Sequence, residues 1–133
     1  MSFDPEFLSL EDVKELHRLS LERFRGSDGI RSDSLLESAT YQAQSGFGGE
    51  FLHPTLYDMA AAYAFHLAEN QPFVDGNKRT ALLSAMTFLR INGIRIDQPT
   101  DELYQAMIRV AEKKLDKNGL AELFRRLAER ESG

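Results

Sequence analysis

The apolar residues of this chain recur mostly at intervals of three and four, the spacing of one face of an α-helix. Ser9 is placed to cap a first helix, and its inward positions are predicted to be Leu10, Val13, Leu16, Ser20 and Phe24. Turn-forming residues at 26–29 end this helix. A second helix is expected from about Asp33 to Ala43, with Leu35, Leu36 and Ala39 inward.

The stretch from Gln44 to Leu52 carries three glycines, at 46, 48 and 49, and is too rich in glycine for a helix. We interpret it as a flexible flap or a short hairpin near the functional site. An ordinary surface loop fits the same composition equally well.

Two long helices follow, from Thr55 to Asn70 and from Asn77 to Asn92, with Pro72 between them. The first is rich in alanine, which favours helix and lets helices approach closely. The second is apolar almost all round, so we expect it to be the buried centre of the fold. Gly93 ends it in a left-handed conformation.

In the last third of the chain, Thr100 with two acidic residues opens a helix predicted to carry Leu103, Met107, Val110 and Leu115. Asn118-Gly119 is expected to divide it from a final helix with inward positions Leu120, Leu123, Phe124 and Leu127. The predicted fold is therefore all-α, with about six helices around a buried central helix. Residues 1–133 are interpreted as a single domain.

The amino-acid composition argues against several classes of function. The chain of 133 residues has 16 basic and 21 acidic residues, a net charge of −5, which argues against direct nucleic-acid binding. No stretch approaches the ~20 apolar residues of a membrane span, and the first residues lack a signal pattern. There is no cysteine, and the three histidines, His17, His53 and His66, are spaced too irregularly for a metal motif. We expect a cytoplasmic protein whose histidines are packed or exposed structural groups.

The segment from Glu69 to Arg79, Glu-Asn-Gln-Pro-Phe-Val-Asp-Gly-Asn-Lys-Arg, interrupts the helical pattern and leads into the second long helix. A helix N-terminus offers unpaired N–H groups and a positive dipole end, which favour anions. Lys78 and Arg79 add cations there, Gly76 allows close backbone approach, and Asp75 offers a hard oxygen to a divalent metal. Phosphate is the anion that suits this arrangement.

These residues resemble the signature of the Fic/Doc family, His-x-Phe-x-(Asp/Glu)-Gly-Asn-x-Arg, and the Lys-Arg ending is similar to its Doc (death-on-curing) toxin branch. The likeness extends over Phe7–Phe24, Gly29–Arg31, Leu35–Ser38, Phe47–Pro54 and Leu89–Gly93. It implies a Fic/Doc-like bundle in which Asp75 holds Mg²⁺ on the phosphates of ATP and Arg79 contacts phosphate oxygens. Gly76, Asn77 and Lys78 would complete the phosphate site. Asn77 could instead cap the helix, and Phe73 is expected to anchor the loop in the core.

Two positions bear on the reaction. Family members that transfer adenylyl groups resemble Gly-Asn-Gly-Arg-x-x-Arg, whereas this chain has Lys78 and Leu82 at the second glycine and second arginine. The resemblance to the Doc branch therefore implies transfer of the ATP γ-phosphoryl group to a hydroxyl of elongation factor Tu. It also implies a Phd-like antitoxin protein as partner. Adenylyl transfer and a silent nucleotide- or antitoxin-binding module are the alternatives.

Gln71 stands where the family has its histidine. A carboxamide can orient a hydroxyl but cannot take its proton, so we expect this residue to impair turnover. Natural divergence and a substitution introduced to make a toxic protein tolerable to cells would both explain it.

Overall fold

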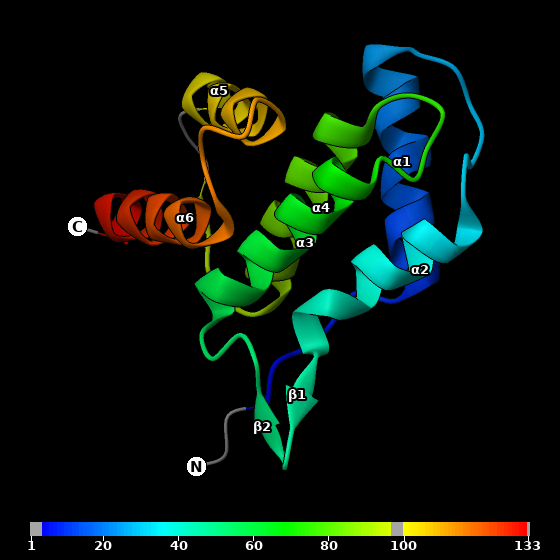
Figure 1. The fold of residues 1–133 in the computed structure, drawn as a ribbon. Coiled ribbons are helices and arrows are strands. Elements are labelled where there is room, and N and C mark those ends of the chain that lie inside the picture. Colours follow the sequence, from blue (N-terminus) through cyan, green and yellow to red (C-terminus); the bar gives the residue numbers. More distant parts are fainter. Residues whose placement is uncertain (1–3, 97–99, 133) are drawn as a thin grey trace.

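The computed structural model describes residues 4–96 and 100–132, a bundle of helices with one small hairpin (Figure 1). The helices of the described residues are α1 (Leu10–Phe24), α2 (Asp33–Tyr41), α3 (Leu56–Asn70), α4 (Asn77–Ile91), α5 (Thr100–Ala111) and α6 (Lys117–Ser132). A 3₁₀ turn, η1 (Gln42–Gln44), continues α2. Strands β1 (Gly46–Phe47) and β2 (Glu50–Phe51) pair antiparallel. The all-α class is confirmed.

Two helices begin with reciprocal side-chain caps. The Asp12 N–H donates to Ser9 Oγ at 3.0 Å, and the Ser9 N–H donates to the Asp12 carboxylate at 2.8 Å. Thr55 and Asp58 repeat this arrangement at the start of α3. Each cap satisfies backbone donors that a helix start leaves free, which fixes where α1 and α3 begin. Both predicted starts are confirmed.

The central helix is α3, and the expectation that α4 would occupy the centre is wrong. Residues Met59–Ala64 of α3 are all fully buried, and Leu67 and Ala68 are nearly so. On α4, by contrast, Ile91 is 43% exposed and Leu82, Leu83 and Met86 are only partly buried. The physical reason is size: the alanines of α3 let neighbouring helices approach it from several sides. In Figure 1, α3 lies inside the bundle with α4 along it.

The hairpin exists, but its predicted place near the loop between α3 and α4 is wrong. The hairpin precedes α3, whereas the loop follows it, and the 15 residues of α3 separate the two by about 22 Å. Figure 1 shows them at opposite ends of the bundle. Phe47 at the hairpin is 94% exposed.

The C-terminal helices divide earlier than predicted. Helix α5 ends at Ala111, Leu115 lies in the connection, and Asn118 and Gly119 belong to the first turn of α6. Lys113 turns the chain with a positive φ of 63°, and the Asp116 carboxylate accepts the Gly119 N–H at 2.8 Å. Asp116 therefore caps α6, so that the Asn-Gly pair follows a helix start instead of breaking a helix.

Phe24 does not face the core as predicted. It is the last residue of α1 and is 48% exposed, and its ring lies under the guanidinium of Arg79 at 4.4 Å. The ring therefore makes a cation–π interaction at the surface and does not pack in the core. Among the described residues, no helix combines the length and apolar character needed to cross a membrane.

Candidate functional site

The loop between α3 and α4 begins and ends with left-handed residues. Gln71 ends α3 with φ 46° and ψ 57°, and its N–H donates to the Leu67 carbonyl at 3.2 Å. Gly76 precedes α4 with φ 79°. Each left-handed residue turns the chain sharply, so that four residues reverse its direction between two packed helices.

Asn77 holds the loop in shape. Its side-chain Oδ1 accepts the Phe73 N–H and its Nδ2 donates to the Phe73 carbonyl, both at 3.0 Å. The side chain makes no capping bond to α4, so the capping alternative is wrong. The amide instead satisfies both backbone groups of a buried residue, which fixes Val74 to Gly76 as a tight turn.

Phe73 anchors the loop, as predicted. Its side chain is 2% exposed and stacks on His17 of α1, with ring centroids 3.8 Å apart and planes 7° apart. His17 Nε2 donates to the Asp75 carbonyl at 2.9 Å. His17 is thus a buried structural residue, as expected, and it also holds the backbone of the loop.

The connection between α1 and α2 forms one wall of the loop. The Val74 N–H donates to the Gly29 carbonyl at 3.0 Å, and the Arg31 N–H donates to the Pro72 carbonyl at 2.7 Å. The Arg31 guanidinium donates to the carbonyls of Asn70 and Gln71 at 2.7 and 2.8 Å. It thereby satisfies carbonyls that the end of α3 leaves free.

Sequence reasoning did not assign these wall contacts. Gly29-Ile30-Arg31 belongs to the resemblance, but an arginine after a turn has no spacing that marks it as a helix cap. The pairing joins residues about forty positions apart, such as Arg31 and Gln71. Local patterns carry no information at that range.

The Asp75 carboxylate lies at the meeting point of the two loops. Its Oδ2 accepts the Ser27 N–H at 3.1 Å and its Oδ1 accepts the Gly76 N–H at 2.9 Å. These two backbone donors, of which Ser27 has the larger effect, hold the pKa of Asp75 below its ordinary value, with smaller contributions from His17 and Arg79. Gly26 leaves room for this carboxylate, because a Cβ at Gly26 would lie 2.8 Å from Oδ2.

Five of the six predicted site residues line one small cavity at this junction. The cavity has a volume of about 240 Å³ and is completed by Ala68, Val74 and Ala111. The five are Gln71, Asp75, Gly76, Asn77 and Lys78. Arg79, the sixth, does not line it: its guanidinium lies 4.4 Å from the Phe24 ring and 5.5 Å from the Tyr104 ring.

The first turn of α4 offers backbone donors near this cavity. Among the described residues, no protein acceptor takes the N–H groups of Asn77, Lys78 or Arg79. They belong to the positive end of a 15-residue helix, where an anion is stabilised by the dipole and by direct hydrogen bonds. The Lys78 side chain adds a formal positive charge at the cavity wall.

The donor set is compatible with magnesium bound together with phosphate. Mg²⁺ prefers oxygen ligands and is commonly held by one or two carboxylates, substrate phosphates and water. Asp75 supplies an exposed carboxylate whose low pKa keeps it ionised. Within the described residues, no three His, Asp or Glu side chains converge on a metal position, so the remaining ligands would come from phosphate and water.

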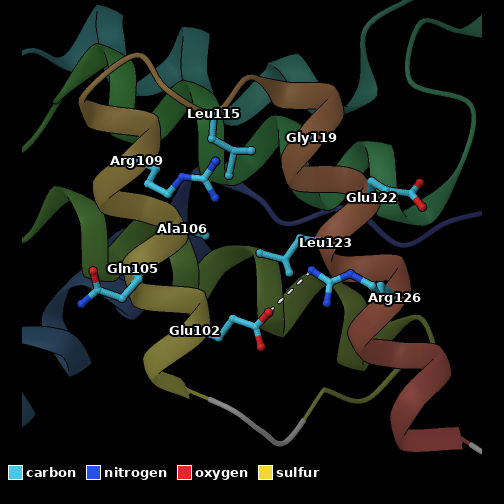
Figure 2. Close-up of a pocket in the computed structure, with 9 residues that line it drawn as sticks. All are labelled: Glu102, Gln105, Ala106, Arg109, Leu115, Gly119, Glu122, Leu123 and Arg126. Carbon is cyan, nitrogen blue, oxygen red and sulfur yellow. Dashed lines mark ion pairs between the residues drawn. The ribbon is translucent and has the colours of Figure 1, made fainter.

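A larger hollow, of about 430 Å³, lies between α5 and α6 (Figure 2). Arg126 reaches across it to Glu102, with 3.6 Å between nitrogen and oxygen, while Glu122 points away from it. None of the predicted site residues lines this hollow. Its size alone therefore gives no reason to prefer it to the cavity at the loop.

The other two histidines lie apart from the loop cavity. His66 Nε2 accepts a hydrogen bond from Lys117 Nζ at 3.2 Å, and burial, with Lys117 and His53 adding to it, lowers the pKa of His66 to about 4. His53 is 5% exposed, and burial also lowers its pKa. Neither lines the cavity, in keeping with the expectation that both are structural.

The fold and the site together define an all-α domain with a polar cavity where a tight loop enters a helix. Comparison with known proteins shows the family to which this chain belongs. The model of the Fic/DOC family matches residues 7–89. The chain is also 37% identical over 118 residues to Toxin Doc of Mycolicibacterium smegmatis, covering 87% of this chain and 88% of that relative. It is 31% identical over 121 residues to Protein kinase doc of Escherichia phage P1, covering 90% and 94% respectively. The chain belongs to the Fic/DOC family.

Proposed function

We propose that this chain is a toxin of the Doc branch that binds ATP with Mg²⁺ at the loop cavity and transfers the γ-phosphoryl group to a protein hydroxyl. The supporting observation is the gathering of Gln71, Asp75, Gly76, Asn77 and Lys78 around one cavity at the start of α4. Two similar proteins carry the names Toxin Doc and Protein kinase doc, which agree with this function. The proposed target is elongation factor Tu, and the proposed partner is a Phd-like antitoxin.

In the proposed reaction, the target hydroxyl oxygen forms a bond to the γ-phosphorus as the bond to the β,γ-bridging oxygen breaks, and ADP leaves with that electron pair. Magnesium would stabilise the charge on the phosphate oxygens. Asp75 would hold the metal, and Lys78 with the free N–H groups of α4 would bind phosphate oxygens. Arg79 would contact phosphate after leaving the Phe24 ring.

The hydroxyl proton must go to a base, and Gln71 is not one. The amide of Gln71 can orient the hydroxyl, and the proton then passes to water with little assistance. We therefore propose that the protein binds nucleotide normally and turns over slowly. A silent binding module is the limiting case of this proposal.

The test is intact-mass analysis of elongation factor Tu after incubation with ATP, Mg²⁺ and either this protein or its Gln71→His variant. We expect the target to gain one phosphoryl group, faster with the variant, and to gain nothing with Asp75→Ala. A gain of one adenylyl group would establish the alternative adenylyl transfer. An unmodified target with Gln71→His, despite ATP binding, would favour the silent module.

A further inference from the structure

A second hollow, of about 410 Å³, lies between α1, α4 and α5. Its walls are mostly apolar, and the aromatic rings of Phe24 and Tyr104 form part of them. Leu82 and Met86 of α4 line it as well, with Ile96 beyond α4. The proposed phosphate chemistry of the loop gives no role to this apolar hollow.

The rings of Phe24 and Tyr104 both lie near one planar group, the guanidinium of Arg79. Its central carbon lies 4.4 Å from the Phe24 centroid and 5.5 Å from the Tyr104 centroid. The central carbon of the Arg23 guanidinium lies 5.5 Å from the Phe24 centroid as well. A guanidinium stacks on an aromatic face much as a nucleobase does. Phe24 keeps 48% of its surface exposed although it ends a helix with apolar neighbours on α4. Its side chain is therefore partly open to solvent, and a planar ligand could reach the ring by replacing a guanidinium.

The hollow is placed to continue the loop cavity. Consecutive residues of α4 line the two spaces, with Lys78 at the loop cavity and Arg79 at the hollow. On α5, Tyr104 lines the hollow and Ala111 lines the loop cavity. Seven residues of α-helix separate these positions by about 10 Å, a span suited to an elongated nucleotide lying along α5.

We propose that this hollow is the site of the nucleobase, which stacks on Phe24 and Tyr104 while the phosphates lie at the loop cavity. The inference rests on the proposed nucleotide binding and adds where the base is held. When nucleotide binds, Arg79 exchanges the aromatic rings for the phosphates, and the base takes the place of the guanidinium. The two aromatic residues are thus binding residues for the base and make no contact with phosphate.

The experiment compares two ligands, ATP and inorganic tripolyphosphate, each with Mg²⁺, by calorimetric titration of the full chain. Tripolyphosphate reports on the loop cavity alone, because it has no base. We expect Phe24→Ala and Tyr104→Ala each to weaken ATP binding by roughly five- to 150-fold, the usual effect of removing one stacking partner. Tripolyphosphate binding should stay within about twofold, and Phe24→Tyr and Tyr104→Phe should retain ATP binding because they keep a ring.

Phe47→Ala, at the exposed hairpin, is the matched control and should leave both ligands unaffected. Thermal unfolding of each variant checks that the fold is intact. Unchanged ATP binding in Phe24→Ala and Tyr104→Ala would overturn the inference and leave the proposed function standing, as would equal losses for both ligands. If the unsubstituted protein binds neither ligand, the proposed function fails and the inference fails with it.

Discussion

The imidazole of His17 lies flat against the phenyl ring of Phe73, with 3.8 Å between ring centroids, and donates its Nε2 proton to the carbonyl of Asp75. One buried side chain of α1 thus packs against the anchor of the loop and also holds the backbone of its metal-binding candidate. His17 therefore contributes both to the stability of the fold and to the geometry of the site.

Replacing His17 by alanine should remove both contacts. Ring stacking and a buried hydrogen bond together contribute about 1–3 kcal/mol, so His17→Ala should lower the free energy of unfolding by that amount. Urea unfolding followed by circular dichroism measures it. Leu19→Ala, an exposed position on the same helix, is the control and should cost less than about 0.5 kcal/mol. Equal midpoints for the two variants would contradict the role given to His17.

Gly26 and Gly29 offer a matched pair at the α1–α2 connection. Both have a positive φ, 134° and 127°, so alanine strains the backbone at either position. An added Cβ at Gly26 would meet Asp75 Oδ2 at 2.8 Å, whereas at Gly29 it would meet a methyl of Val74 at 3.0 Å. We expect both variants to be destabilised, and only Gly26→Ala to lose magnesium-dependent ATP binding, by at least about tenfold. Titration calorimetry with and without Mg²⁺ would show this, and similar losses in both would contradict it.

His66 should make stability depend on pH. Its pKa is lowered from 6.5 to about 4 in the folded protein, so between these values the unfolded chain binds more protons at this site than the folded chain does. The free energy of unfolding should therefore fall as pH drops from 6.5 towards 4. His66→Gln should flatten this slope, measured as the urea midpoint at several pH values. A slope identical to that of the unsubstituted protein would exclude His66 as its source.

The Gln71→His substitution should restore a proton acceptor without new backbone strain, because residue 71 already has φ 46° and histidine tolerates left-handed geometry well. A general base typically contributes about 10²–10⁴-fold in rate, and we expect the initial rate of phosphoryl transfer to rise by that factor. Gln71→Asn, which keeps an amide, is the control and should bring no increase. Radiolabel transfer from ATP to elongation factor Tu measures both rates.

The local sequence predicted most helix positions. It predicted less well which helix and which side chains are buried in the core. The cap at Ser9 could be predicted because capping needs only residues three positions apart, and the start at Thr55 followed from the helical pattern. The choice of α3 over α4 as the centre depends on which helix the others surround, and an apolar count cannot decide that. Phe24 contacts Arg79, fifty-five positions later in the chain. The exposure of Phe24 therefore could not be predicted from its helical spacing.

At the site, five of the six residues predicted from the motif line one cavity. The motif does not indicate which residues outside it support this cavity. Ser27 and Arg31 act through a backbone N–H and through bonds to backbone carbonyls, respectively. Such contacts follow from the path of the chain and leave no distinctive residue pattern.

The wall built by residues 25–32 gives the molecule an unusual vulnerability. This segment carries few side chains into the core, yet Ser27, Gly29 and Arg31 keep the neighbouring turn in register. We expect a single protease cut within it to leave the helices paired and their circular dichroism nearly unchanged. The nicked molecule should look native to most assays of folding, although its loop cavity would have lost its shape.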